Sequence, residues 1–243
     1  MSLAMKPSSN GAIVAPRLAA TVLLVRDRAE GLQVFMVVRH HQIEFASGAL
    51  VFPGGKVDPE DHVWAGDDAE KAARIAAIRE TYEECGVLLA RGRDAGPVAL
   101  SEDRPPFYQR LEAESLTPTL DALTLFAHWI TPTILPRRFD TRFYIVEAPA
   151  NQAAAHDGGE AVDSVWIEPQ RALDEATQGR RTLVLPTRLN LELLAQSATA
   201  EQAIAAARAR RVLPIEPQAA KTSSGYRLTI PADAGYSGSD FDV

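Results

Sequence analysis

Short runs of apolar residues, separated by turn-forming residues, predict several strands. Residues 19–25 and 33–38 are two such runs, and Glu30-Gly31 between them is typical of a turn. A shorter run, residues 49–52, ends at Pro53-Gly54-Gly55. The same pattern returns later in the chain and predicts strands at residues 123–130, 142–146 and 162–167.

A longer helix is expected between Asp67-Asp68 and about Cys85, because acidic residues favour a helix N-terminus and Gly86 is typical of a helix end. Its apolar residues recur at helical spacing, at Ile75, Ile78, Tyr82 and Cys85. Shorter helices are predicted at residues 108–113, 169–176, 189–195 and 201–210. Strands mixed with helices indicate an α/β fold in which a mixed sheet lies between helical layers.

Length and composition narrow the classes of function. The 243 residues suffice for one large domain or a domain with an appendage, and a hydrophobic content of 46% is ordinary for a globular protein. The net charge of −7 argues against a nucleic-acid partner. Since no apolar run reaches about 18 residues, no membrane span is expected. The single cysteine, Cys85, excludes an internal disulfide and favours a reducing compartment, the cytoplasm.

The predicted long helix carries three carboxylates close together, those of Glu80, Glu83 and Glu84. Residues three and four apart are neighbours on a helix, and like charges at this spacing destabilise it by about 0.2–0.5 kcal/mol per pair. A bound metal cation would offset the repulsion. Ligands that are all oxygen suit Mg²⁺ or Mn²⁺, so these side chains are candidate metal ligands.

Residues 79–87 read Arg-Glu-Thr-Tyr-Glu-Glu-Cys-Gly-Val, downstream of Phe-Pro-Gly-Gly at residues 52–55. This string resembles the signature of the Nudix hydrolases, with Thr81 at a position where an aliphatic residue is usual. The resemblance implies an α/β/α sandwich with a mixed sheet and extra C-terminal helices. It also implies an enzyme that uses divalent metals to cleave a nucleoside diphosphate joined to another group.

The resemblance covers residues 17–177, the expected Nudix domain. Residues 1–16 are rich in Ser, Gly, Pro and Ala and are expected to be disordered or loosely held. Residues 178–243 are expected to form a helical extension packed on the same domain.

The resemblance also implies roles for single residues. Glu80, Glu83 and Glu84 would be metal ligands, together with the carbonyl of Gly55. Arg79 would orient a carboxylate through a bidentate pair. Glu83 and Glu84, with Arg79, would form the catalytic group, because a carboxylate can also take the proton from water.

The first half of the signature has two registers in this chain. The signature begins with a glycine followed, after five residues, by an acid. Starting from Gly54 this acid is Glu60, and starting from Gly55 it is Asp61. In the family the second glycine is usually the start, which favours Asp61. The segment between Asp61 and Arg79 is about ten residues longer than the corresponding part of the Nudix signature. An inserted loop spanning residues 61–70 is therefore expected.

A further catalytic acid is often supplied late in this fold, shortly before a Trp on a strand. Glu160 lies before Trp166 and is the candidate, and Glu168 is the second choice. An ordinary loop acid is the alternative interpretation of Glu160.

The inserted loop and residues 51–58 and 131–143 are similar to the coenzyme A and acyl-coenzyme A diphosphatases among the Nudix hydrolases. Arg39 and Gly48 match the coenzyme A pattern, whereas His40 and Glu44 stand where it has a small residue and a second Arg. Substrate phosphates are expected to bind Arg39, Arg137 and Arg138, and Arg142 is a further candidate. A salt-bridged surface is the alternative for those three later arginines.

Three functions remain open at this point. The first is hydrolysis of coenzyme A, acyl-coenzyme A or another small-molecule nucleotide conjugate. The second is the same chemistry on ADP-ribose or a dinucleotide. The third is a non-catalytic regulatory module on the same scaffold. Many relatives pair into dimers, so the resemblance allows a homodimer.

Overall fold

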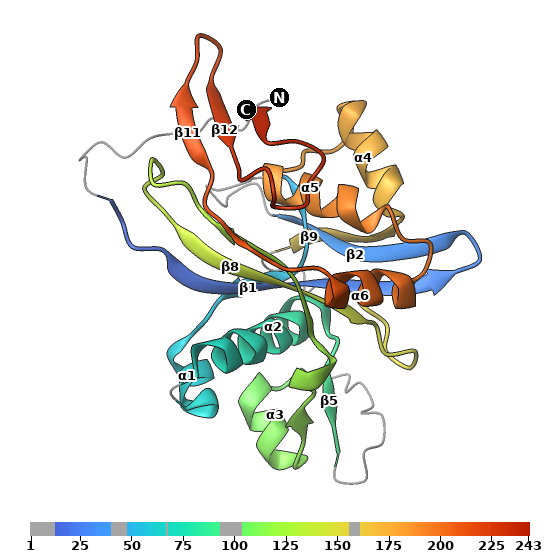
Figure 1. Ribbon diagram of the computed structural model, residues 1–243. Helices are drawn as coiled ribbons and strands as arrows, with labels where there is room; N and C mark the ends of the chain where they lie inside the picture. The colour runs from blue at the N-terminus through green and yellow to red at the C-terminus, as the bar shows by residue number, and fades with distance from the viewer. Residues whose placement is uncertain (1–12, 40–47, 67, 93–103, 156–160) are drawn as a thin grey trace.

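The computed structural model describes residues 13–39, 48–66, 68–92, 104–155 and 161–243 (Figure 1). Among these residues, eight strands form the main sheet: β1 (Arg17–Arg28), β2 (Gly31–Arg39), β3 (Leu50–Val51), β4 (Gly54–Lys56), β7 (Thr124–Ile130), β8 (Phe139–Glu147), β9 (Ala161–Ile167) and β10 (Pro214–Ile215). The helices are α1 (Pro59–Ala65), α2 (Ala69–Cys85), α3 (Phe107–Ala113), α4 (Pro169–Thr177), α5 (Leu185–Leu194) and α6 (Ala200–Ala209). The smaller elements are β5 (Ala90–Arg91), β6 (Thr117–Pro118), the 3₁₀ helix η1 (Leu120–Ala122), β11 (Gln218–Lys221), β12 (Tyr226–Thr229) and β13 (Asp240–Asp242).

β1 is a central strand of the main sheet, whose order is β10-β7-β8-β1-β2-β3, with β4 also paired to β1 and β9 to β2. β1 runs parallel to β8, with Ala20 opposite Arg142. On its other edge β1 pairs antiparallel with β4, where Ala20 lies opposite Gly55, and then with β2. The sheet is therefore mixed, and the predicted α/β class is confirmed.

Side chains of β1 are buried on both faces of the sheet. Val22 and Leu24 belong to the core beneath α2, whereas Leu23 and Val25 belong to the core on the opposite face, and all four are fully buried. Successive side chains of a strand point to opposite faces, so a strand covered on both sides reads as a continuous apolar run. This explains the uninterrupted run at residues 19–25.

α2 forms where the sequence predicts it. The Asp68 side chain accepts a hydrogen bond from the backbone N–H of Lys71 (3.0 Å) and caps the start of the helix. Gly86 ends it in the left-handed conformation, with φ of 72°, and donates its N–H to the carbonyl of Tyr82 (2.9 Å). The predicted apolar stripe of α2 is buried: Ile75, Ile78, Tyr82 and Cys85.

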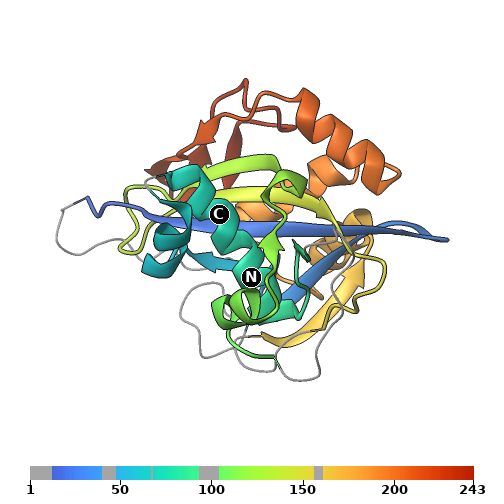
Figure 2. The ribbon, with the colours of Figure 1, turned by 90° about the horizontal axis from the view of Figure 1, so that it is seen from below.

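Helices lie on both sides of the main sheet. α1, α2 and α3 cover one face, and Figure 2, seen from that side, shows them in front of the strands. The opposite face is covered by α4, α5 and α6, whose apolar residues share a core with Leu23 and Val25. Leu189, Leu191 and Leu194 of α5 are buried in this second core. The sandwich of two helical layers agrees with the prediction.

The segment after α6 is tied to the sheet by a chain of hydrogen bonds. Trp129 Nε1 on β7 donates to the hydroxyl of Tyr236 (3.1 Å), which donates to Asn190 Oδ1 on α5 (2.7 Å). Burial raises the pKa of Tyr236 to about 12, so its hydroxyl remains a donor at neutral pH. Residues far apart in the chain are thereby held together at one point.

Two details differ from the predictions. Part of the expected insertion is the helix α1 and not a loop, with Pro59 in its first turn. The C-terminal extension contains β10 and the three-stranded sheet β11-β12-β13 besides its helices. The expected loose N-terminal segment lies mostly outside the described residues. Within the described parts, no helix combines the length and the apolar character needed to cross a bilayer.

Truncation of Leu189 tests whether the C-terminal helices unfold together with the rest of the domain. Leu189→Ala removes a fully buried side chain from the core opposite α2, and we expect a loss of about 2–5 kcal/mol in the free energy of unfolding. Urea titrations followed by circular dichroism and by tryptophan fluorescence should shift together. The control is Leu193→Ala, a half-buried position on the same helix, where a smaller loss is expected. Two separate transitions would show that the C-terminal part unfolds on its own.

Candidate functional site

The guanidinium of Arg79, on α2, uses all five of its N–H groups. Nε and Nη2 form a bidentate pair with the two oxygens of Asp61 (3.0 and 2.9 Å), and Nη2 also donates to the carbonyl of Lys56 (2.9 Å). Nη1 donates to Glu80 Oε1 and to Glu83 Oε2, both at 2.9 Å. Since a guanidinium has five donors, none is left over. The predicted role of Arg79 in orienting carboxylates agrees with this geometry.

The structure decides between the two registers of the signature in favour of Asp61. The Asp61 carboxylate is fully buried on α1, whereas Glu60 is exposed. Asp61 Oδ2 also accepts the backbone N–H of Asp58 (2.7 Å) at the start of α1. A buried carboxylate is stable only when it is paired and hydrogen-bonded. Asp61 therefore depends on Arg79, and Arg79 on Asp61.

Charge and burial act on Arg79 in opposite directions. Burial disfavours the charged form, but the hydrogen bond to Asp61 and the negative charges of Glu80, Asp61 and Glu83 outweigh it. The pKa of Arg79 is therefore raised above its ordinary value, and the guanidinium stays charged at any working pH.

Tyr108, on α3, joins the same group, although no sequence pattern predicted it. Its hydroxyl donates to Asp61 Oδ1, and its ring packs against Trp64 of α1 with ring centroids 5.2 Å apart. Burial and the hydrogen bond to Asp61 raise the pKa of Tyr108, so the phenol keeps its proton. Trp64, which lies in the inserted segment, also packs against the core beneath α2.

The paired glycines of β4 leave space for two carboxylates of α2. A Cβ on Gly55 would lie 2.4–2.8 Å from the carboxylate atoms of Glu80, so Glu80 occupies the space where a side chain would be. The N–H of Gly54 donates to Glu84 Oε2 (2.9 Å). Gly54 has φ of 151° and a Cβ there would meet the backbone of Ala20 and Thr21, so this position requires glycine for steric reasons. A Cβ on Gly55 would displace only the end of the Glu80 side chain.

These residues match a hard divalent cation in the type of donor that they offer. Glu80 touches the backbone of Gly55, and Glu84 reaches the neighbouring N–H, so two carboxylates flank a bend whose carbonyl is a further oxygen donor. Within the described parts of the chain, however, no three acidic or histidine side chains gather closely enough to hold an ion. Glu80 and Glu83 each give one carboxylate oxygen to Arg79 Nη1, so a cation held by these residues would lie beside the guanidinium.

Comparison with known proteins identifies the family. The model of the NUDT19 Nudix domain matches residues 65–191, which is more than half of the 243 residues. The chain belongs to the Nudix family.

Named Nudix relatives and a solved structure agree with this assignment. A Caenorhabditis elegans protein named as nudix hydrolase 7 is 33% identical over 74% of this chain and 61% of its own length. The acyl-coenzyme A diphosphatase NUDT19 of Xenopus laevis is 26% identical over 59% of this chain and 54% of its own length. The chain thus spans less than two thirds of both relatives. A crystal structure of a Nudix hydrolase from Alicyclobacillus acidocaldarius superposes with a TM-score of 0.72 and 28% identity, over 80% of this chain and 97% of that one.

Thr81 is the one departure from the second half of the Nudix signature, and the helix accommodates it. The side chain is fully buried, and its hydroxyl donates to the carbonyl of Ala77 one turn earlier (2.7 Å). A buried hydroxyl without a partner would be costly. Thr81 therefore replaces an aliphatic residue without leaving a polar group unsatisfied.

The arginines predicted to bind substrate phosphates differ in their surroundings. Arg138 is only 5% exposed and donates to the carbonyls of Thr131 (2.9 Å) and Val14 (2.7 Å) and to Glu216 (2.6 Å). These partners engage its guanidinium within the protein, as in the salt-bridged alternative, and phosphate binding by Arg138 stays a prediction. Arg137, next to it, is exposed.

Arg142 is also engaged within the protein, through Asp140 (2.6 Å) and Glu70 (3.3 Å), as the salt-bridged alternative predicted.

For three other predicted site residues the structure shows few contacts or none. Glu160 lies outside the described residues, and so does the side chain of Arg39, whose backbone ends β2. Glu168 precedes α4 as its N-terminal flanking residue, and makes no capping hydrogen bond there with its side chain. Their roles remain predictions.

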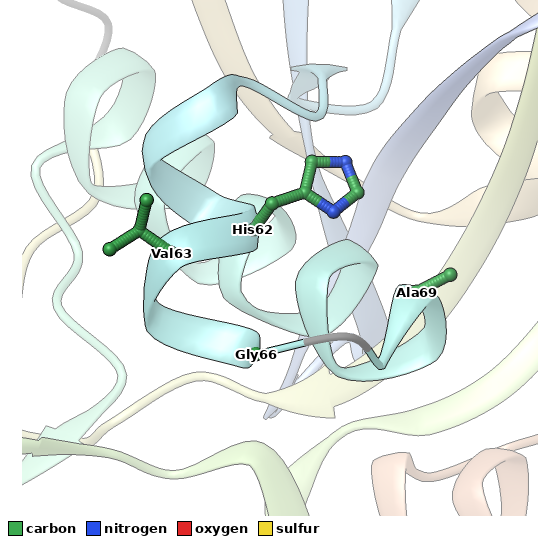
Figure 3. A pocket seen from close by; sticks show the side chains of 4 residues that line it. All are labelled: His62, Val63, Gly66 and Ala69. Carbon is green, nitrogen blue, oxygen red and sulfur yellow. The ribbon is translucent and has the colours of Figure 1, made fainter.

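A surface pocket of about 500 Å³ lies where α1 meets the start of α2 (Figure 3). It is lined by His62, Val63, Gly66 and Ala69. None of the predicted metal ligands lines it, and in Figure 3 the His62 ring and the Val63 side chain leave α1 on different sides. The pocket is therefore separate from the carboxylate group.

Placing a methyl group on Gly55 tests whether Glu80 must occupy its position. Gly55→Ala forces the Glu80 carboxylate away, and because that side chain can turn aside, we expect little change in the melting temperature. The affinity for Mn²⁺, measured by electron paramagnetic resonance, should fall by about tenfold or more. Gly92→Ala is the matched control, because a Cβ there meets only Leu116 at 4.0 Å. Unchanged Mn²⁺ affinity in Gly55→Ala would contradict the placement of Glu80.

Proposed function

We propose that the protein hydrolyses the diphosphate bond of a nucleoside diphosphate conjugate, with coenzyme A or an acyl-coenzyme A as the first candidate. The observation that carries the proposal is the carboxylate group of α2, held by Arg79 against the Gly54-Gly55 bend. Membership of the Nudix family and the likeness to an acyl-coenzyme A diphosphatase support the substrate class.

The reaction adds water across a P–O–P linkage. The water oxygen forms a bond to one phosphorus, the bridging oxygen leaves with the other phosphate, and two phosphate monoesters result, with the release of two protons when both monoesters are fully ionised. Both the substrate and this site are anionic, so cations are needed to bring them together. A bound Mg²⁺ or Mn²⁺ would supply that neutralisation and would lower the pKa of water.

The chain itself supplies ligands, orientation and a base. Glu80, Glu83 and Glu84, with the carbonyl of Gly55, would hold the metal. Arg79 keeps Glu80 and Glu83 on one side of α2, so their carboxylates are ordered in advance. The Glu83 side chain is 45% exposed, which leaves it accessible to water, and it is our candidate for accepting the proton.

Several finer assignments belong to the same proposal. Arg39 and Arg137 are candidates to bind substrate phosphates, and Glu160 is a candidate further acid. The partner is a small-molecule nucleotide conjugate, with no nucleic acid and no membrane. A homodimer and a cytoplasmic location stay predictions.

ADP-ribose or a dinucleotide is the second candidate substrate. The observation that favours it is Glu44, an acid where the coenzyme A pattern has an Arg, because a carboxylate there would repel the phosphates of the coenzyme. A non-catalytic regulatory role is the weaker alternative, since a binding module would not need the full set of carboxylates.

Neutralising Glu84 tests the catalytic proposal. Glu84→Gln keeps the size of the side chain but removes a charge beside Gly54, and we expect kcat to fall by about 10²-fold or more with Mg²⁺ present. Glu60→Gln, on the exposed side of α1, is the control and should keep full activity. Wild-type turnover by Glu84→Gln would rule out the assignment.

A substrate screen separates the two candidates. Coenzyme A, an acyl-coenzyme A, ADP-ribose and a dinucleotide are incubated with the protein and Mg²⁺ or Mn²⁺, and the phosphate monoesters are quantified. We expect the highest kcat/KM for coenzyme A or its acyl ester. A preference for ADP-ribose or a dinucleotide would select the second candidate, and no hydrolysis of any conjugate would favour the regulatory module.

A further inference from the structure

We propose that Tyr108 is a positioning residue for the carboxylate group of α2, acting through Asp61 and Arg79. The inference rests on the proposed function, because it assigns Tyr108 a part in preparing the metal ligands. Tyr108 lies outside the Nudix signature and 47 residues from Asp61 in the sequence.

Three helices meet at one buried carboxylate. Asp61 on α1 is 0% exposed, Arg79 on α2 is 6% exposed and Tyr108 on α3 is 8% exposed. The Tyr108 ring is held in place by Trp64 on one side and by Phe107, whose ring centroid is 5.0 Å away. The hydroxyl is therefore fixed in space by packing, and it can in turn fix Asp61.

The hydrogen bonds of Asp61 are complete only with Tyr108. Oδ1 accepts from Arg79 Nε and from the Tyr108 hydroxyl, and Oδ2 accepts from Arg79 Nη2 and from the N–H of Asp58. Four donors match the roughly four lone-pair sites of a carboxylate. Removal of the Tyr108 hydroxyl would leave one lone-pair site of the buried Asp61 carboxylate without a hydrogen-bond donor.

The consequence reaches the metal ligands because Arg79 has no spare donor. Its Nε and Nη2 are fixed by Asp61 and the Lys56 carbonyl, which sets where Nη1 points. Nη1 is the nitrogen that holds Glu80 and Glu83. When Asp61 shifts to recover a hydrogen bond, the rigid guanidinium shifts with it, and the spacing of the two carboxylates changes.

Tyr144 provides a matched control for a structural role alone. It is a buried phenol on β8 whose hydroxyl donates to Glu70 Oε1 (2.9 Å). Glu70 lies in the first turn of α2, the helix that also carries Arg79. As at Tyr108, burial and a neighbouring carboxylate raise its pKa. Glu70 forms ion pairs with Arg74 and Arg142, neither of which belongs to the Arg79 group.

The experiment compares Tyr108→Phe with Tyr144→Phe in the full chain. Mn²⁺ affinity is measured by electron paramagnetic resonance without substrate, and kcat, KM and Tm are measured alongside. We expect Tyr108→Phe to lose about 2–4 °C in Tm, because its hydrogen bond to Asp61 is buried, and Tyr144→Phe to lose no more, because its hydrogen bond to Glu70 is only partly buried. Only Tyr108→Phe should bind Mn²⁺ about tenfold more weakly and lose kcat by a similar factor, with KM little changed.

Each outcome is decisive. If wild type binds Mn²⁺ and hydrolyses a conjugate but the two variants keep equal Mn²⁺ affinity, the role of Tyr108 is overturned and the proposed function stands. If wild type does neither, the proposed function falls and the inference falls with it. If Tyr108→Phe does not fold, Trp64→Phe carries the test: it keeps the hydroxyl but loosens the ring, and a smaller loss of Mn²⁺ affinity is expected. Unchanged affinity in that variant would overturn the inference.

Discussion

The ion pair between Arg79 and Asp61 is the constraint on which the candidate site depends. It joins α1 to α2 and, through the Lys56 carbonyl, to β4. Burying either charge alone would be strongly unfavourable, so the pair enforces the relative position of these three elements. Asp58, Asp61, Glu80 and Glu83 contribute four negative charges against the single positive charge of Arg79. Negative charge is therefore in excess around Arg79, and such an excess attracts cations.

The sheet positions the Gly54-Gly55 bend next to the carboxylates of α2. β4 pairs with β1 at Ala20 and Thr21, which places Gly54 and Gly55 beneath α2. The helix is held over the bend by its buried stripe, and its carboxylates project beside that stripe. One face of the helix therefore contributes to stability, while the adjacent face carries the carboxylates that we propose as metal ligands. Extra helices on the far side of the sheet complete the second core.

Much of this arrangement could be predicted from the sequence because its signals are local. The bounds of α2 follow from Asp68 and Gly86, and the face that carries Glu80, Glu83 and Glu84 follows from helical spacing. α1 was missed because a helix of seven residues is too short to show a periodic pattern. The C-terminal strands were missed for the same reason, as each has only two to four residues. Contacts over long sequence separations, such as Tyr108 with Asp61 or Arg138 with Glu216, leave no trace in the spacing of a single chain.

The central claim is that the acidic residues beside the glycine bend bind divalent cations. The most direct measurement is anomalous scattering from crystals of the protein soaked in MnCl₂ together with a non-hydrolysable nucleotide conjugate. The account predicts anomalous peaks ligated by Glu80, Glu83 and Glu84 and by the carbonyl of Gly55. Peaks elsewhere, or carboxylates that stay turned toward Arg79 with no peak among them, would contradict it.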